Sequence, residues 1–198
     1  MGRVWFSPPG AGLYVSIVLR PKAGPPALLT LAAGVALADG IRTSTGLPAE
    51  IKWPNDLRVG RRKLAGILAE AAAQGAGLPF VIVGFGLNLR PAAYPPALAD
   101  RVTSIEAELN RPADRAVILS QILAALAARY ADLQAGRFDA ILSAWRRYAG
   151  SLSGSLVEWD SPSGVRRGRA EDLDEEGALL VRANGRTERL IAGEVRWI

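Results

Sequence analysis

Residues 51–67 read IKWPNDLRVGRRKLAGI, and their pattern predicts short strands joined by tight polar turns. A strand over 49–53 leads into WPNDL, where proline restricts the residue before it and the Asn-Asp pair tolerates turn dihedrals. RVGRR, at 58–62, reads as a second polar turn, and the apolar run LAGILAEAAA at 64–73 predicts a further strand. We therefore expect this stretch to form a strand–turn–strand unit of a sheet.

The same stretch holds two of the three lysines in the chain, Lys52 and Lys63, whereas 21 of the 24 positive side chains are arginines. Asp56 lies between the two lysines, and three guanidinium groups crowd the same loop: Arg58, Arg61 and Arg62. Together these groups predict a compact anion site. An ammonium group is a titratable point charge that can face a developing phosphoryl charge without imposing a bidentate geometry. The alternative interpretation is that both lysines are ordinary surface residues.

The composition excludes several kinds of site. The 198 residues include no cysteine and no histidine, which excludes disulfides, thiolate zinc sites, histidine triads and histidine metal sites. The net charge of +5 favours acidic partners such as nucleotides, nucleic acid or acidic proteins, although arginine-rich usage can also reflect genome composition. The sequence has no run of about 18 apolar residues, and its start does not read as a signal peptide. We therefore expect a soluble cytoplasmic protein with no membrane partner.

The remaining segments up to residue 150 predict an α+β domain. A short run rich in β-branched residues predicts a strand at 13–19, and the apolar run at 78–89 predicts a central strand buried on both faces, next to the strand at 64–73. Apolar residues at helical spacing predict helices at 27–45, which should end at Gly46, at 111–136 and at 138–150. Residues 91–103 are expected to form a proline-containing loop.

A change of composition near residue 150 predicts a domain boundary, with one domain over 1–150 and a second over 151–198. In the second domain, short alternating segments are separated by the turn signals SPSG at 161–164, DEEG at 174–177 and NG at 184–185. About five short strands in this length predict a small β-barrel. We interpret the cluster Arg166, Arg167 and Arg169 as a solvated barrel loop. The alternative, a nucleic-acid patch, lacks interleaved aromatic residues.

Two further motifs are candidates for ligand binding. In GFGLN, at 84–88, two glycines allow a ligand to approach the backbone closely, and Asn88 offers a donor and an acceptor that suit an adenine edge. Close packing at a strand end would need the same glycines. Near the N-terminus, Arg3 and Trp5 are suited to binding a phosphate and stacking on a base, although terminal residues are often frayed.

Four motifs occur in an order and at spacings that resemble the biotin protein ligase family: GRVWFSPPGAGLYVS at 2–16, KWPND at 52–56, KLAGIL at 63–68 and GFGLN at 84–88. The resemblance implies a catalytic domain with a mixed sheet like that of class II aminoacyl-tRNA synthetases, followed by an SH3-like C-terminal barrel. It implies that ATP, accompanied by Mg2+, activates biotin as biotinyl-5′-AMP. The biotinyl group would then pass to a lysine of the biotin carboxyl carrier protein of acetyl-CoA carboxylase.

The resemblance also implies roles for individual residues. Lys63, Asp56 and Arg3 would be catalytic, with Lys63 contacting the biotin carboxylate and the α-phosphate. The ATP and adenylate would contact Lys52, Asn55, Trp5 and Asn88. The biotin pocket would be formed by Arg3 and Lys63 together with Gly66, Leu68, Gly84, Gly86 and Leu87. The segment AGEV, at 192–195, resembles the part of the C-terminal domain that ends near the active site.

The chain also departs from the family pattern. The Gly/Arg-rich loop before Arg3 and the biotin-contacting elements ahead of it do not appear, so we expect the catalytic domain to be incomplete at its N-terminus. A start codon further upstream is the favoured explanation, and a fragment or a natural truncation are the alternatives. No winged helix-turn-helix precedes the domain, which favours a monofunctional ligase without nucleic-acid binding. The alternatives are a lipoate-type ligase, a non-catalytic biotin- or nucleotide-binding remnant of the same fold, and a basic nucleic-acid-binding protein. Dimerisation through the central sheet is common in such families, so a homodimer is also expected.

Overall fold

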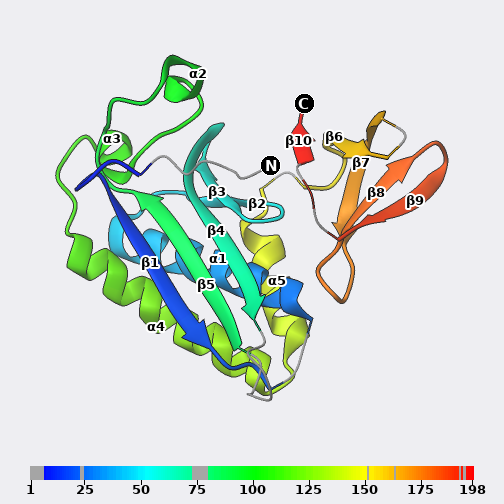
Figure 1. Cartoon of the computed structure of the whole chain (residues 1–198), viewed down its shortest axis with the longest axis horizontal. Coiled ribbons are helices and arrows are strands. Elements are labelled where there is room, and N and C mark those ends of the chain that lie inside the picture. Colours follow the sequence, from blue (N-terminus) through cyan, green and yellow to red (C-terminus); the bar gives the residue numbers. More distant parts are fainter. Residues whose placement is uncertain are drawn as a thin grey trace.

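The computed structural model describes residues 7–22, 25–72, 80–150, 152–162, 164–191, 193 and 195–198. Within them a larger α+β part is followed by a small all-β part at the C-terminal end (Figure 1). The division expected near residue 150 remains a proposal. It is supported by the two sheets, which share no strand.

The first sheet has five strands in the order β1-β5-β4-β3-β2, and each neighbouring pair is antiparallel. Its members are β1 (Gly12–Leu19), β2 (Glu50–Lys52), β3 (Asp56–Val59), β4 (Arg62–Ala72) and β5 (Phe80–Asn88). The strands expected at 13–19 and 49–53 are confirmed, and so is the pairing of the two apolar runs that became β4 and β5. The strand β3 was not predicted, because it occupies residues that read as two consecutive turns. The second turn is correspondingly short and is centred on Gly60, whose φ is 57°.

Three helices cover one face of this sheet: α1 (Pro26–Thr45), α4 (Arg115–Gln134) and α5 (Phe138–Tyr148) (Figure 1). The predicted end of α1 is confirmed, because Gly46 is left-handed and its N–H donates to the Arg42 carbonyl at 2.9 Å. The helix expected from 111 starts four residues later, because the Asp114 side chain caps it by accepting from the N–H groups of Ala116 and Val117.

Two short helices, α2 (Pro96–Ala99) and α3 (Ile105–Leu109), lie within and just after the expected loop at 91–103. α3 begins at a polar cap, because the Ser104 hydroxyl accepts from the Ala107 N–H. Neither helix was predicted, since segments of four and five residues carry no helical periodicity.

The helix α1 is the centre of the core. Most of its side chains are buried, and at Gly40 it approaches α4 so closely that an added Cβ would lie 2.6 Å from the Ile122 backbone nitrogen. By length and composition, Ala27–Thr45 and Arg115–Gln134 are also apolar enough to cross a membrane. The burial of α1 accounts for its apolar character. The buried residues of α4 lie in the same core: Ile118, Ile122, Leu126 and Leu133.

The prediction that β5 is buried on both faces is wrong. Along β5, Val81, Val83 and Phe85 are buried, whereas alternate residues from Phe80 to Gly84 are only partly covered. The physical reason is that the helices pack on one face of the sheet alone, so that β5 is central in strand order but open on its second face.

The second sheet has the order β10-β6-β7-β8-β9 and is antiparallel throughout. Its strands are β6 (Leu156–Ser161), β7 (Gly164–Leu173), β8 (Leu179–Ala183), β9 (Arg186–Leu190) and β10 (Val195–Trp197). The five expected strands are therefore present. The NG hairpin is also confirmed, because Asn184 and Gly185 both have positive φ, of 51° and 77°.

The arginine cluster lies on strand β7 rather than in the loop where we placed it. Arg166 pairs with Glu188, Arg167 pairs with Glu158 at 2.9 Å, and Arg169 donates to the Gly154 carbonyl. These partners occupy each of the three guanidinium groups, which weakens the case for a nucleic-acid patch.

Candidate active site

The open face of the first sheet carries a floor of glycines. The register places Gly66 of β4 opposite Gly86 of β5, and Gly86 opposite Tyr14 of β1. One step along the sheet, Gly84 lies between Leu68 and Ser16. Directly paired residues project from the same face, so these side chains surround a strip of bare backbone. A groove of about 360 Å3 lies over part of this strip, and the residues that line it are Ser7, Tyr14, Val15, Ser16, Leu68, Gly84, Phe85 and Gly86.

At one end of the glycine floor, the Lys63 ammonium lies 2.5 Å from the Asp56 carboxylate. A β-bulge creates this pair. Regular alternation would put Lys63 on the same face as Ala65, which is buried under the helices, but the register between β3 and β4 shifts between Leu57 and Arg58. Leu64 is left as the extra residue and enters the core, while Lys63 turns to the open face. The Lys63 side chain is 44% exposed and that of Asp56 is 26% exposed, so the pair can meet a ligand.

The backbone of Lys63 is held from outside the sheet. Its N–H donates to the Arg101 carbonyl, and its carbonyl accepts from the Thr103 N–H, both at 2.8 Å. The Thr103 carbonyl accepts from the Asn88 amide at 2.9 Å. The segment 101–103 is therefore hydrogen-bonded to both Lys63 and Asn88. The family resemblance associated Lys63 with the α-phosphate and Asn88 with the adenine.

The cationic groups of the loop are not equivalent. Lys52 is paired in register with Asp56 and shares its face of the sheet. Arg58 forms an ion pair with Glu50 at 3.1 Å, and Arg62 forms one with Glu108 at 2.7 Å. The carboxylates of Glu50 and Glu108 therefore offset these two guanidinium charges, as Asp56 offsets that of Lys63.

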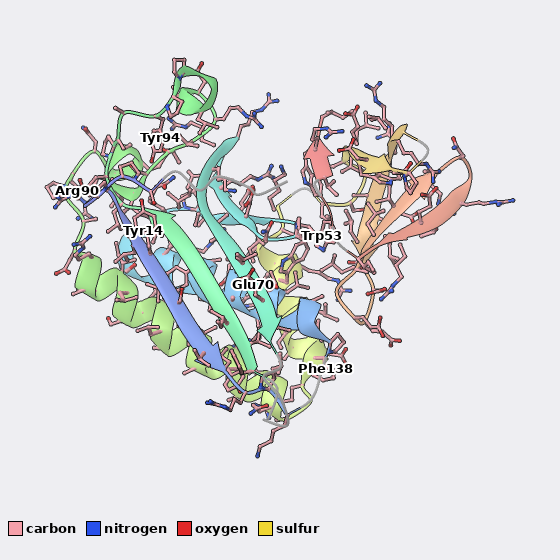
Figure 2. All side chains as sticks on the ribbon, viewed as in Figure 1. Tyr14, Trp53, Glu70, Arg90, Tyr94 and Phe138 are labelled. Atoms are coloured by element: carbon pink, nitrogen blue, oxygen red, sulfur yellow. The ribbon has the colours of Figure 1, made fainter. Side chains whose placement is uncertain are left out.

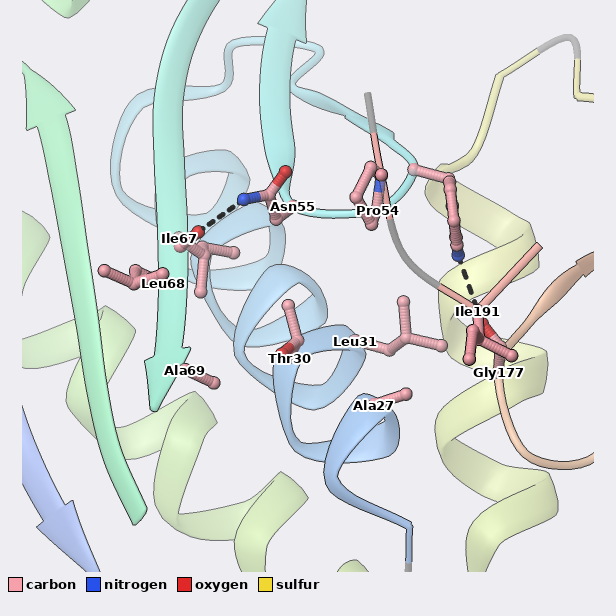
Figure 3. Close-up of a pocket in the computed structure, with 12 residues that line it drawn as sticks. Ala27, Thr30, Leu31, Pro54, Asn55, Ile67, Leu68, Ala69, Gly177 and Ile191 are labelled. Carbon is pink, nitrogen blue, oxygen red and sulfur yellow. Dashed lines mark hydrogen bonds between the residues drawn. The ribbon is translucent and has the colours of Figure 1, made fainter. Parts of the chain in front are cut away.

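The turn between Lys52 and Asp56 is anchored on both sides. The Asn55 amide donates to the Ile67 carbonyl at 2.7 Å, and the Ile67 N–H donates to the Asn55 carbonyl at 2.8 Å. The Trp53 indole N–H donates to the Gly177 carbonyl at 3.1 Å. The bond from the Asn55 amide to Ile67 and the bond from Trp53 to Gly177 border a second crevice of about 220 Å3. This crevice lies between the turn, α1 and the C-terminal sheet (Figure 3). Leu68 lines both hollows.

Two neighbouring tyrosines lie near the groove, and one of them, Tyr14, lines it. Tyr14 projects from β1, and Tyr94 lies above it in the loop before α2 (Figure 2). Burial raises the pKa of Tyr14, and burial together with the neighbouring Tyr14 raises the pKa of Tyr94. Both phenols therefore remain neutral at physiological pH and can act as hydrogen-bond donors.

The structure brings most of the predicted site residues together. Lys52, Asp56, Lys63, Asn88 and Gly66 share the open face with Gly84, Gly86 and Leu68. The Leu87 side chain is instead fully buried and pairs with Leu13 and Ala65 on the helix-covered side, so it can border the groove only through its backbone. Arg3 and Trp5, and residues 192 and 194 of AGEV, lie outside the described residues.

Sequence reasoning missed Tyr14, Ser16, Tyr94 and Thr103. The alternation in LYVSIVL was a usable signal for the first two, because Tyr14 and Ser16 are two residues apart and so share a face. Tyr94 and Thr103 come from an irregular segment whose place over the sheet follows from long-range pairing. Among the described residues, no group of three or more acidic side chains forms a metal site.

Comparison with known proteins shows the family of the chain. Residues 1–88 match the Biotin/lipoate A/B protein ligase family, and residues 154–196 match the Biotin protein ligase C terminal domain. The chain belongs to the biotin protein ligase family. It is similar to the Biotin--[acetyl-CoA-carboxylase] ligase of Paracoccus denitrificans, with 32% identity over 98% of this chain and 83% of the relative, and to that of Mycobacterium tuberculosis, with 35% identity over 98% and 72%.

A longer relative is the Bifunctional ligase/repressor BirA of Bacillus subtilis, which is 33% identical over 98% of this chain. The chain spans 61% of the length of that relative. Among solved structures, the biotin protein ligase of Aquifex aeolicus in complex with biotin and ATP matches with a TM-score of 0.86 and 25% identity, over 100% of this chain and 82% of that one. The predicted fold, with its SH3-like C-terminal part, is thereby confirmed.

Proposed function

We propose that the chain is an ATP-dependent biotin–protein ligase. The observation that carries the proposal is the Lys63–Asp56 pair, which stands on an open sheet face at the end of a glycine floor. Biotin combines a small apolar ring system with one carboxylate. A bare strip of backbone suits the first, and an ammonium group at the end of that strip suits the second.

In the first half-reaction, a biotin carboxylate oxygen attacks the α-phosphorus of ATP, and the bond to the bridging oxygen breaks as pyrophosphate leaves. Negative charge grows on the α-phosphate oxygens during this step. Lys63, supported by Lys52 on the same face, stabilises that charge, and its fixed position avoids reorganisation as the charge develops. Arg3, to which the family resemblance assigns a phosphate contact, is proposed to add a further positive group.

In the second half-reaction, the ε-amine of a carrier lysine attacks the carbonyl carbon of the mixed anhydride, and AMP leaves with the bonding electrons. The amine must lose a proton. Asp56 is the proposed acceptor, since its carboxylate is partly exposed and is oriented by Lys63. The acetyl-CoA-carboxylase named in the two similar ligases supports a biotin carboxyl carrier domain as the acceptor protein.

For the substrates, Gly66, Gly84 and Gly86 with Leu68 are proposed to form the biotin floor, and Tyr14 and Ser16 are proposed as its far wall. Asn88, Asn55, Lys52 and Trp5 are proposed for the ATP. One amide hydrogen of Asn88 and one of Asn55 already serve the fold, so each contributes through its remaining donor and its oxygen. Mg2+ would be held chiefly by the triphosphate, because the described residues offer no carboxylate cluster.

The rest of the assignment is proposed with it: a cytoplasmic enzyme that binds neither nucleic acid nor membrane and pairs with a second copy through a sheet edge. The pairing of the arginines on β7 with carboxylates and a carbonyl supports the absence of nucleic-acid binding. Among the described strands, β1 and β2 are the outermost of the first sheet, and these edges are proposed for dimerisation.

The test is the complete reaction. The purified chain is given ATP, Mg2+, biotin and a biotin carboxyl carrier domain, and both pyrophosphate and biotinylated carrier are measured. Biotin-dependent release of pyrophosphate followed by modification of one carrier lysine is the expected result. If lipoate replaces biotin with equal efficiency, the lipoate-type alternative holds. If biotin binds but no pyrophosphate forms, the chain is a non-catalytic remnant and the proposal fails.

A further inference from the structure

The turn that separates Lys52 from Asp56 is held by a part of the chain 124 positions away. The Trp53 side chain is 2% exposed, and its indole N–H donates to the carbonyl of Gly177 in the turn between β7 and β8. Figure 2 shows Trp53 at the junction between the two parts of the molecule, and a dashed line in Figure 3 marks its bond to Gly177. Nothing in the chemistry proposed above uses this contact.

Gly177 is fitted to this place. Its φ is +85°, and an added Cβ would lie 2.8 Å from Leu31 Cδ1 and 3.4 Å from Leu28 Cδ2, so the turn rests directly on α1. The turn is also fixed internally, because the Asp174 carboxylate accepts from the N–H groups of Glu176 and Ala178 at 3.0 and 2.8 Å. The Gly177 carbonyl is therefore presented to Trp53 by a preorganised loop, the one that the sequence marked as DEEG.

The other side of the Trp53–Asn55 turn is bound to the catalytic sheet. Asn55 exchanges two hydrogen bonds with Ile67 of β4, and the next residue, Asp56, begins β3 opposite Gly66. A rotation of the turn would thus move Asp56 relative to Lys63, whose own backbone is fixed by residues 101–103. The Asp56 carboxylate that this turn leads into lies 2.5 Å from the Lys63 ammonium.

We propose that Trp53 is a positioning residue, which uses Gly177 of the C-terminal sheet to fix Asp56 against Lys63. The C-terminal part thereby becomes a structural support of the active site. The expected effect on kcat rests on the proposed function. The expected effect on the position of the Trp53–Asn55 turn does not. A misplacement of about 1 Å at a reacting group can cost about 100-fold in rate, so loss of a single hydrogen bond at this place should be visible in kcat.

The contact can be tested without separating the two parts. Arg146 of α5 also joins them, through Asp172 at 2.7 Å and the Leu173 carbonyl at 3.0 Å, and it stays in place when the Trp53 bond is removed. The variant Trp53→Phe keeps an aromatic ring but loses the indole donor together with the volume of the pyrrole part of the ring, so a control that loses the same volume without a hydrogen bond is needed. Trp145→Phe is the matched control, because Trp145 is also fully buried and, among the described residues, its N–H has no partner.

Two measurements are made on the full chain. In Trp53→Phe, kcat for biotin-dependent pyrophosphate release should fall between about 10- and 100-fold with little change in the KM for biotin, because the glycine floor is untouched. Hydrogen exchange of residues 50–59, followed by mass spectrometry, should become about 2- to 12-fold faster, because loss of one hydrogen bond lowers the free energy of local opening by about 0.5–1.5 kcal/mol. Trp145→Phe should change neither.

Unchanged kcat and unchanged exchange in Trp53→Phe would overturn the inference, and so would equal losses in the Trp145→Phe control. If the unmodified chain releases no pyrophosphate, the proposed function has failed, but the exchange comparison still decides whether Trp53 fixes the turn. Faster exchange in Trp53→Phe alone would support the positioning role in that case.

Discussion

The glycine floor makes a sharp prediction for Gly84→Ala. A Cβ built on Gly84 meets no protein atom closer than 3.7 Å, the nearest being the Leu68 carbonyl, with Ser16 Oγ and the Val15 carbonyl at 3.9 Å. These are ordinary van der Waals contacts, so the fold accepts the methyl group without moving. Replacing glycine in a strand interior also lowers the entropy cost of folding, so the free energy of unfolding should stay equal or rise by up to about 1 kcal/mol.

Ligand binding should respond in the opposite direction. The new methyl group would stand on the floor between Leu68 and Ser16, in the space proposed for the biotin rings. One methylene group in a closely fitted pocket is worth about 1–3 kcal/mol, which is about 10- to 200-fold in affinity. The Kd for biotin by calorimetry and the KM for biotin in pyrophosphate release should both rise within this range, while the KM for ATP stays within about twofold on the same reasoning.

Gly34→Ala is the matched control. Gly34 lies in α1 under the covered face of the sheet, where an added Cβ would meet Ile51 and Ile67 at 3.6 and 3.7 Å. The same chemical change is therefore sterically acceptable there and distant from the groove. An unchanged biotin Kd in Gly84→Ala, or an equal rise in Gly34→Ala, would refute the placement of biotin on the glycine floor.

Two predictions concern stability. Gly40→Ala should lower the free energy of unfolding by about 1–3 kcal/mol in urea melts, because its Cβ would meet the Ile122 backbone at 2.6 Å; a loss no larger than that of Gly34→Ala would contradict the close α1–α4 crossing. For Asp174, burial alone would raise the pKa, but hydrogen bonds from Arg189 and from the Ala178 and Glu176 N–H groups outweigh it and lower the pKa below its usual value. Its contribution to stability is therefore complete above the unfolded pKa of about 3.9 and is lost as the pH falls through the lower folded value. Melting curves between pH 7 and pH 2 should show this acid-dependent loss in the unmodified chain and a smaller one in Asp174→Asn, and parallel curves would count against it.

Local signals in the sequence predicted the features that depend on local physics. Gly46 ends α1 because a left-handed residue is needed there, and Asn184-Gly185 forms a hairpin because both residues accept positive φ. The same holds for the apolar runs that became β1 and β5. At such positions one or two residues determine the backbone, so that little depends on the rest of the chain.

The features that the sequence did not predict depend on distant partners. Leu64 enters the core and turns Lys63 to the open face only because β3 and β4 pair with a shifted register. β5 is open on one face because all three long helices pack on the other, and the buried side chain of Leu87 follows from that layering. The contact of Trp53 with Gly177 joins two sheets, and no pattern within KWPND indicates it.

The most direct test of the account is the rate of biotin-dependent pyrophosphate release in Lys63→Ala and Lys63→Arg, compared with Lys22→Ala. Lys22 is an exposed lysine on the connection between β1 and α1, and its replacement should leave the rate unchanged. Loss of a preorganised positive group at the developing charge should lower the rate of Lys63→Ala by about 100-fold or more. Lys63→Arg should also be impaired, because a bidentate guanidinium does not reproduce a point charge at this position. Release that needs biotin and continues at the full rate in both Lys63 variants would contradict the assignment of Lys63 and, with it, the proposed mechanism.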